Sequence, residues 1–386
     1  MRKREHHSMR TRILTRSIAV VSSMALLASA AACGDNTAST TGAAPSTVAI
    51  DESVSSLTGE YAGAGASSQQ TAVEAWIEGF RSIAPKATVA YNPSGSGAGV
   101  STFLTGSTAW AGSDKALSAD EVEQSKSVCA SGTAFDVPVY VSPIAVAFNL
   151  EGISTAGKHI NMDAATIAGI FNGSITKWND EKIREQNPGL DLPDLAITVV
   201  HRSDKSGTTQ NFVSYLKDAA PDSWTYELSE NWPNEVGQGA KGTSGVISTL
   251  KQANGTIGYA DFSQVGSLGT VAVKVGDSYS PISAEAGSKV IADSKVDTTV
   301  DGDNRIVIDI NHNTSANGAY PIVLVSYDIV CPAYKDANTA KFAKAWLTYV
   351  TGDEGQQAAQ TAAGVAPLPA DLASKVKASI DQIKVD

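Results

Sequence analysis

Glycines, hydroxyl side chains and one Arg–Asp pair occur where three helices are expected to begin. The segments are "GAGASSQQTAVEAW" (63–76), "YNPSGSGAGVSTFL" (91–104) and "HRSDKSGTTQNFVSYL" (201–216). A helix N-terminus presents unpaired backbone N–H groups and the positive end of the helix dipole, so it can hold an anion. In the third segment Arg202 adds a planar guanidinium, which suits two oxygens of a tetrahedral anion. One such start would be an ordinary N-cap. For three such starts in one chain, two interpretations remain: a site for an oxyanion, or three ordinary helix caps.

The motifs of nucleotide-binding proteins and hydrolases are missing from the sequence. It contains no G-x-x-x-x-G-K-[ST] loop and no G-x-S-x-G elbow, and "GSGAG" (95–99) has the wrong spacing for a dinucleotide fingerprint. His159, His201 and His312 are far apart and show no metal-ligand spacing. We therefore expect no cofactor, no metal and no catalytic residue, although distant Asp residues could still meet at a metal site.

Short apolar runs alternate with helical patterns along the chain. One helix is expected at 71–83, where Val73, Trp76, Ile77 and Phe80 share a face. Another is expected at 338–351, ending at Gly352. Strands are expected at 87–91, 139–150, 196–200, 270–275, 304–310 and 320–331. This alternation predicts an α/β fold with largely parallel sheets.

The first 32 residues have the order of a secretory signal peptide. A basic stretch is followed by the short apolar run "SIAVVSSMALLASAAA" and then by Cys33. This order resembles a lipobox, with Ala30 where Leu is usual, so we expect Cys33 to be lipidated. Residues 33–56 would then be the lipidated Cys and a flexible tether that anchors the protein at the outer face of the cell membrane. A plain signal peptide cleaved elsewhere is the alternative.

The charge and cysteine content limit the partners of the exported part. The chain carries a net charge of −11 and its first 32 residues contribute +5, so the remainder carries −16. Such an acidic body is a poor partner for nucleic acid, and any anion must be held by local geometry. Cys129 and Cys331 remain after Cys33. In an exported protein this pair favours a disulfide, and two buried free thiols are the alternative.

Beyond the three helix starts, the chain resembles the periplasmic phosphate-binding proteins of high-affinity phosphate ABC transporters, in their actinobacterial lipoprotein form. The resemblance covers roughly 57–385. It rests on "LTGEYAGAGAS", "SGSGAGVSTF", "WAGSDKALS", "IFNGSITKWND", "HRSDKSGTTQNFVSYL", "NGTIGYADF" and "YPIVLVSYDIVC". It implies a two-lobed, Venus-flytrap α/β fold with a hinge. Lobe I would be 57–141 plus 324–386, and lobe II would be 142–323.

The resemblance also implies roles for individual residues. Asp114 would accept a proton from the ligand, which hydrogen phosphate can offer and sulfate cannot. Asp204 would be the salt-bridge partner of the clamping Arg202. Ser68 stands where some members of the family have Phe and use only the backbone N–H. The implied phosphate-binding residues are Ser67, Ser68, Ser96, Asp114, Arg202, Ser206, Gly207 and Thr208.

The function that the resemblance implies is extracytoplasmic binding of inorganic phosphate between the lobes. The protein, expected to be a monomer, would deliver phosphate to the permease subunits of an ABC transporter and would catalyse nothing. Two alternatives stay open. One is a secreted phosphatase-like enzyme, which would need a metal. The other is a phosphate receptor or adhesin on the same fold.

Overall fold

The structure, a computed structural model, describes residues 52–154 and 159–385. The expected signal peptide (1–32), Cys33 and most of the tether (33–56) lie outside these residues. The described residues form one compact unit. None of its helices is long and apolar enough to cross a membrane.

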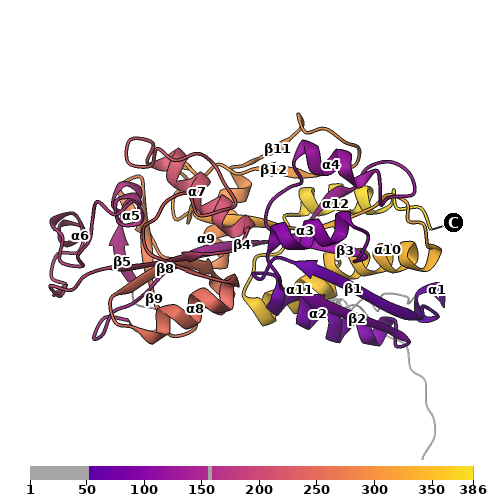
Figure 1. The fold of residues 1–386 in the computed structure, drawn as a ribbon, viewed down its shortest axis with the longest axis horizontal. Helices are drawn as coiled ribbons and strands as arrows, with labels where there is room; N and C mark the ends of the chain where they lie inside the picture. Colours follow the sequence, from indigo (N-terminus) through magenta and orange to yellow (C-terminus); the bar gives the residue numbers. More distant parts are fainter. Residues whose placement is uncertain (1–51, 155–158, 386) are drawn as a thin grey trace, which may run out of the picture. The chain divides into compact units, whose positions relative to one another are not determined.

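One sheet of eleven strands runs through this unit (Figure 1). Eight strands follow the order β2-β1-β3-β13-β4-β8-β6-β7, and β9 pairs with β4 while β5 and β10 pair with β9. A separate pair joins β11 (Lys295–Asp297) to β12 (Val307–Asp309). The strands of the large sheet are β1 (Gly59–Gly65), β2 (Ala87–Asn92), β3 (Trp110–Ser113), β4 (Phe135–Asn149), β5 (His159–Met162), β6 (Thr198–Arg202), β7 (Gln238–Ala240), β8 (Thr256–Asp261), β9 (Gly269–Val275), β10 (Ser278–Ser280) and β13 (Val323–Val330).

The long strand β4 joins the two halves of this sheet. Its residues 135–143 pair with β13, and its residues 144–149 pair with β8. Figure 1 shows β4 passing from the group of β1, β2 and β3 toward the group of β8 and β9. Both groups thus share a continuous backbone. The lobe limits at 141/142 and 323/324 stay a prediction.

The sheet is mixed, so the prediction of largely parallel sheets was wrong. Strands β1–β2, β1–β3, β5–β9, β6–β7 and β6–β8 pair in parallel. Strand β13 is antiparallel to β3 and β4, and β4 is antiparallel to β8 and β9. The reason is that the chain passes along β4 away from the group of β1, β2 and β3 and comes back to this group along β13. The two neighbouring strands therefore run in opposite directions. A local alternation of strands and helices does not reveal such a return.

Helices cover the sheet and supply much of the core. The predicted helices at 71–83 and 338–351 are confirmed as α2 and α10, which lie side by side through Trp76 and Trp346, whose ring centroids are 6.4 Å apart. The helices are α1 (Glu52–Ser55), α2 (Gln70–Ile83), α3 (Ser96–Leu104), α4 (Ala119–Ser125), α5 (Ala164–Phe171), α6 (Glu181–Glu185), α7 (Gly207–Ala219), α8 (Gly242–Gln252), α9 (Ala284–Ala292), α10 (Ala337–Thr351), α11 (Asp353–Ala363), α12 (Ala370–Ile380) and the short 3-10 helix η1 (Phe262–Gln264).

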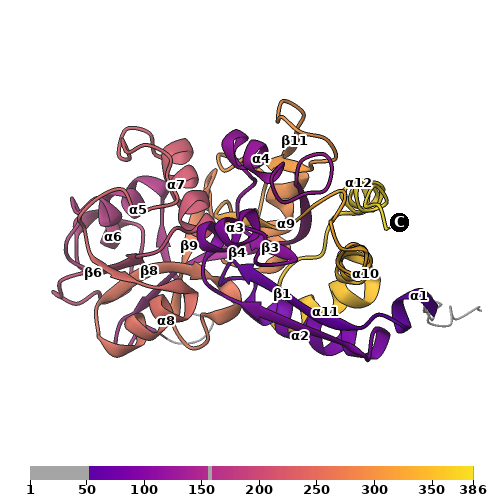
Figure 2. The same ribbon diagram turned by 45° about the vertical axis from the view of Figure 1, so that its right-hand side comes forward.

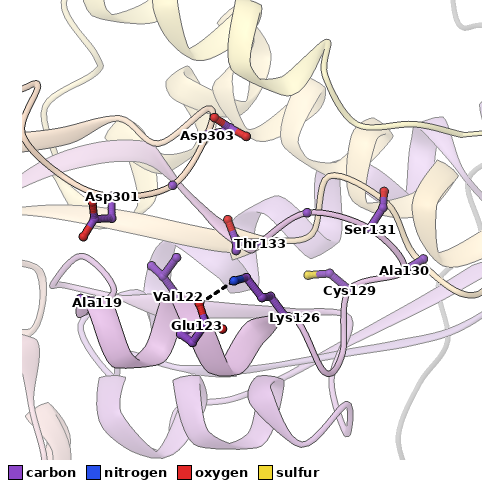
Figure 3. Close-up of a pocket in the computed structure, with 12 residues that line it drawn as sticks. Ala119, Val122, Glu123, Lys126, Cys129, Ala130, Ser131, Thr133, Asp301 and Asp303 are labelled. Atoms are coloured by element: carbon purple, nitrogen blue, oxygen red, sulfur yellow. Dashed lines mark hydrogen bonds and ion pairs between the residues drawn. The ribbon is translucent and has the colours of Figure 1, made fainter.

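A disulfide joins Cys129 to Cys331, as the sequence favoured. Their Cα atoms are 5.3 Å apart and 202 positions separate them in the chain. The Ala130 N–H also donates to the Ala333 carbonyl at 2.9 Å. The bridge therefore ties the segment before β4 to the end of β13. A cavity of about 610 Å³ opens beside it, lined by α4 and by residues 129–133 and 301–303 (Figure 3).

We expect both cysteines of the disulfide to resist alkylation until a reductant is added. Peptide mass analysis after alkylation of the unreduced, denatured protein should find no adduct on Cys129 or Cys331. Replacing both residues by Ala should lower the free energy of unfolding by about 2–5 kcal/mol, because the unfolded chain regains the freedom of a long loop. Ser131→Ala, in the same loop, is the control. Adducts on both cysteines without reductant would show that the bridge is absent.

Candidate functional site

Two of the three predicted helix starts meet at one hydroxyl, and the first segment joins them through the hydrogen bond from Ser68 to Asp114. Ser96, at the start of α3, accepts hydrogen bonds from the backbone N–H groups of Asp114 and Gly207, each at 3.2 Å. Asp114 directly follows β3, and Gly207 begins α7. The starts of α3 and α7 therefore meet beside β4, and both views show this (Figure 1, Figure 2). Close approach is required here, because a Cβ on Gly207 would lie 2.7 Å from the Asp114 carbonyl carbon.

Asp114 is a buried carboxylate that accepts hydrogen bonds from three hydroxyl groups. Its Oδ2 accepts from Ser68 at 2.5 Å and from Thr208 at 2.9 Å. Its Oδ1 accepts from Ser326 at 2.7 Å. Burial raises the pKa of Asp114, and the three hydroxyls and nearby Arg202 act against that rise. An ionised Asp114 is therefore a hydrogen-bond acceptor that lies among hydroxyl and backbone N–H donors.

Arg202, which is buried, and Asp204, which is partly exposed, form a bidentate ion pair beside these groups. Arg202 Nε donates to Oδ1 at 2.8 Å and Nη2 to Oδ2 at 2.6 Å. Burial would raise the pKa of Asp204, but these bonds and a Gly242 N–H hold it below its usual value. Asp204 uses two of the five N–H groups of a guanidinium, so the fork is fixed and keeps donors for another anion. Gly95, with φ of 102°, makes room, because a Cβ there would lie 2.4 Å from Asp204 Oδ2.

The other two predicted residues are engaged at neighbouring helix starts. Ser67 Oγ accepts the Thr243 N–H at 2.9 Å, and the Ser67 carbonyl accepts from Gln264 at 3.0 Å. Ser206 is the N-cap of α7 and accepts the Thr209 N–H at 3.2 Å. All eight residues predicted to bind phosphate are buried and lie on these connected segments.

Some members of this cluster were missed by sequence reasoning. Thr243 lies at the start of α8, a fourth helix start whose "KGTSG" (241–245) carries the same glycine and hydroxyl signal. Gln69 and Ser326 gave no signal of their own. They join the cluster because Gln69 Nε2 donates to Ser326 Oγ at 2.9 Å.

The three histidines that the structure describes lie apart from one another and contact other groups. Within residues 52–154 and 159–385, no three His, Cys, Asp or Glu side chains lie close enough to hold a metal ion. His159 contacts Thr270, His201 stacks on Trp232, and His312 contacts the Pro321 carbonyl.

Comparison with known proteins gives the class of this fold. Residues 37–354 match the family model of the PBP superfamily domain. A high affinity periplasmic phosphate-binding protein (PfluDING), solved with phosphate, matches with a TM-score of 0.66 at 20% identity, over 83% of this chain and 93% of that chain. A putative phosphate ABC transporter substrate-binding protein from Clostridium perfringens gives 0.57 at 19% identity, over 80% and 100% of the two chains. The predicted periplasmic-binding-protein fold is thereby confirmed.

Sequence relatives narrow this class to one family. The chain is 36% identical over 332 residues to phosphate-binding protein PstS 2 of Mycobacterium tuberculosis, covering 84% of this chain and 87% of that protein. It is 30% identical over 331 residues to PstS of Xylella fastidiosa, covering 83% and 84%. The chain belongs to the PstS phosphate-binding proteins of the PBP superfamily. This is a family of binding proteins, which confirms the resemblance and the prediction that the chain is not an enzyme.

A second buried carboxylate, Asp328, lies next to the site and should make stability depend on pH. It accepts from Trp346 Nε1 at 3.0 Å, and burial raises its pKa to about 7. An unfolded Asp has a pKa of about 4. Between these values the folded chain binds more protons than the unfolded chain, so Asp328 makes stability fall as the pH rises and has no further effect above pH about 7.

We therefore expect Asp328→Asn to remove part of the loss of thermal stability between about pH 5 and pH 7. The midpoints of thermal unfolding of wild type and variant, measured across this range in buffers without phosphate or sulfate, test this. Asp353→Asn, an exposed residue at the start of α11, is the control. Parallel curves for wild type and Asp328→Asn would contradict the assignment.

Proposed function

We propose that this protein binds inorganic phosphate outside the cytoplasm and delivers it to the permease subunits of an ABC transporter for import. The observation that carries the proposal is Asp114, a hydroxyl-bonded carboxylate beside the fixed guanidinium of Arg202 and the starts of α3 and α7. The names of its relatives, phosphate-binding proteins, support the same ligand.

The chemistry of the site suits hydrogen phosphate. Helix starts and Arg202 supply donors for the oxygens that carry charge. Asp114 supplies an acceptor for the P–OH group, which phosphate retains at pH 7 and sulfate lacks. The donors would come from the side chains or backbone of Ser67, Ser68, Ser96, Arg202, Ser206, Gly207 and Thr208.

Capture and release would use opening and closing of the two lobes, 57–141 plus 324–386 and 142–323. Contacts between residues of the two lobes support a closed form. Lys115 Nζ lies 3.8 Å from Glu230, and Asn211 Nδ2 donates to the Asp114 carbonyl at 2.7 Å. The hinge would lie where β4 exchanges β13 for β8.

The proposed location is the outer face of the cell membrane, with a lipid on Cys33 as the anchor. The support is the sequence alone, since Cys33 lies outside the described residues. The protein would act as a monomer without a cofactor and would not bind nucleic acid.

Titration of the wild-type protein with phosphate and sulfate, beside a metal-free phosphatase assay, tests the function. We expect phosphate to bind, sulfate to bind about 10⁴-fold more weakly, and no ester to be hydrolysed. Asp114→Asn keeps the shape but adds an amide donor, so sulfate affinity should rise relative to phosphate. Asp120→Asn, exposed on α4, is the control. If Asp114→Asn kept the wild-type selectivity for phosphate over sulfate, the assignment of Asp114 to the binding site would be wrong.

Arg202→Ala should weaken phosphate binding by about 100-fold or more, because it removes charge-assisted hydrogen bonds and leaves Asp204 unpaired near an anion. Arg202→Lys should not restore binding, since a point charge cannot reproduce the fork. Calorimetric titration gives the dissociation constants. Lys205→Ala, which removes a nearby exposed cation, should bind like wild type. A Lys variant with wild-type affinity would contradict the bidentate contact.

Cys33→Ala should abolish lipidation and release the protein to the medium or leave it unprocessed. Cell fractionation followed by immunoblotting measures its distribution between membrane and medium. If the variant stayed with the membrane in the same amount and size as wild type, the proposed anchor would be wrong.

A further inference from the structure

The amide of Gln69 lies behind the site in one defined orientation. Its Nε2 lies 3.0 Å from the Tyr327 carbonyl, a group that can only accept a hydrogen bond. Its Oε1 lies 3.4 Å from the Tyr91 hydroxyl, whose one proton is donated to the Ala66 carbonyl at 2.9 Å, so the Tyr327 carbonyl alone decides the orientation. Exchanging the two amide atoms would place an oxygen against the Tyr327 carbonyl. The donor end of Gln69 is therefore fixed toward β13.

This orientation determines where the proton of Ser326 points. Gln69 Nε2 also lies 2.9 Å from Ser326 Oγ, and Ser326 Oγ lies 2.7 Å from Asp114 Oδ1. Gln69 and Ser326 are each fully buried, with no exposed surface. A hydroxyl has one proton. Because Gln69 donates to Ser326, the Ser326 proton is directed to Asp114.

We propose that Gln69 is a positioning residue for anion selectivity, which orients the Ser326 hydroxyl so that Asp114 remains a hydrogen-bond acceptor. This proposal rests on the proposed phosphate function. Without Gln69, Ser326 is free to rotate and to point its lone pairs at Asp114. Asp114 would then take up a proton more readily, and a protonated carboxyl can donate to sulfate as well as to phosphate.

The surroundings of Asp114 make each hydroxyl donor important. Arg202 is the cation that favours its ionised form. The ionised form in turn adds to the rise in the pKa of Asp261, which burial mainly raises to about 6. The charged and titratable groups that face Asp114 are Arg202, Asp261, Tyr91 and Tyr140. Gln69 Nε2 also lies 3.5 Å from Oδ1 of Asp328, whose pKa burial raises to about 7, so Gln69→Met changes the surroundings of that group as well.

The test compares phosphate and sulfate dissociation constants of Gln69→Met and wild type between about pH 5 and pH 8.5. We expect Gln69→Met to lower the preference for phosphate over sulfate by about tenfold. As the pH falls and Asp114 takes up a proton, this preference should begin to decrease at a higher pH in the variant than in wild type. Gln70→Met is the control, since Gln70 is partly exposed and pairs with Glu74. It should leave the preference for phosphate and its pH dependence unchanged. Ser326→Ala should reproduce the effect, whereas Ser326→Thr keeps a hydroxyl and should retain selectivity.

The outcomes separate this proposal from the function on which it rests. A wild-type protein that binds no phosphate overturns both. Wild-type phosphate binding together with an unchanged preference and pH profile in Gln69→Met overturns only the role of Gln69. If Gln69→Met weakened the binding of phosphate and of sulfate equally at every pH, Gln69 would have only a structural role. That result would also overturn its proposed role in selectivity. If Gln69→Met does not fold, a Ser326→Ala variant with wild-type selectivity overturns the proposal.

Discussion

The burial of the Asp114 carboxylate is the constraint on which the site depends. An ionised carboxylate removed from water is strongly destabilised unless donors replace its hydration. Here the donors are Ser68 after β1, Thr208 on α7 and Ser326 on β13, three segments that are distant in the chain. The sheet order places β1, β3 and β13 as successive neighbours, which brings these segments to one place. The fold and the acceptor are thus parts of one arrangement.

The protein concentrates local donors in a chain that is negative as a whole. Arg202 is buried and its charge is partly balanced by Asp204, so the pair offers direction more than net charge. The helix starts add partial positive charge without any titratable group. An anion can be recognised in this way although residues 33–386 carry a net charge of −16, because the hydrogen bonds of the site act over a few ångströms and solvent screens the more distant charges.

Local sequence signals predicted the helix starts, the Arg–Asp pair and the cysteine partners, because each depends on spacing or on composition. The cross-chain contacts of Gln69 and Ser326 could not be predicted, since a buried Gln and a strand Ser carry no mark of their partners. The mixed sheet was missed for the same reason: the return of β13 beside β4 is a long-range pairing. Thr243 was different, because "KGTSG" carried the signal that identified the other three starts.

The disulfide also determines how the chain would carry mechanical load. Cys129 and Cys331 lie at the two ends of the excursion made by β4 through β13, and 202 positions separate them. A force applied between residues 52 and 385 would pass directly across the sulfur bridge. The enclosed residues 130–330, which include Arg202 and Thr208, lie outside that load path. They would not be extended while the outer segments were stretched, so half of the anion site is shielded from tension by a covalent bond.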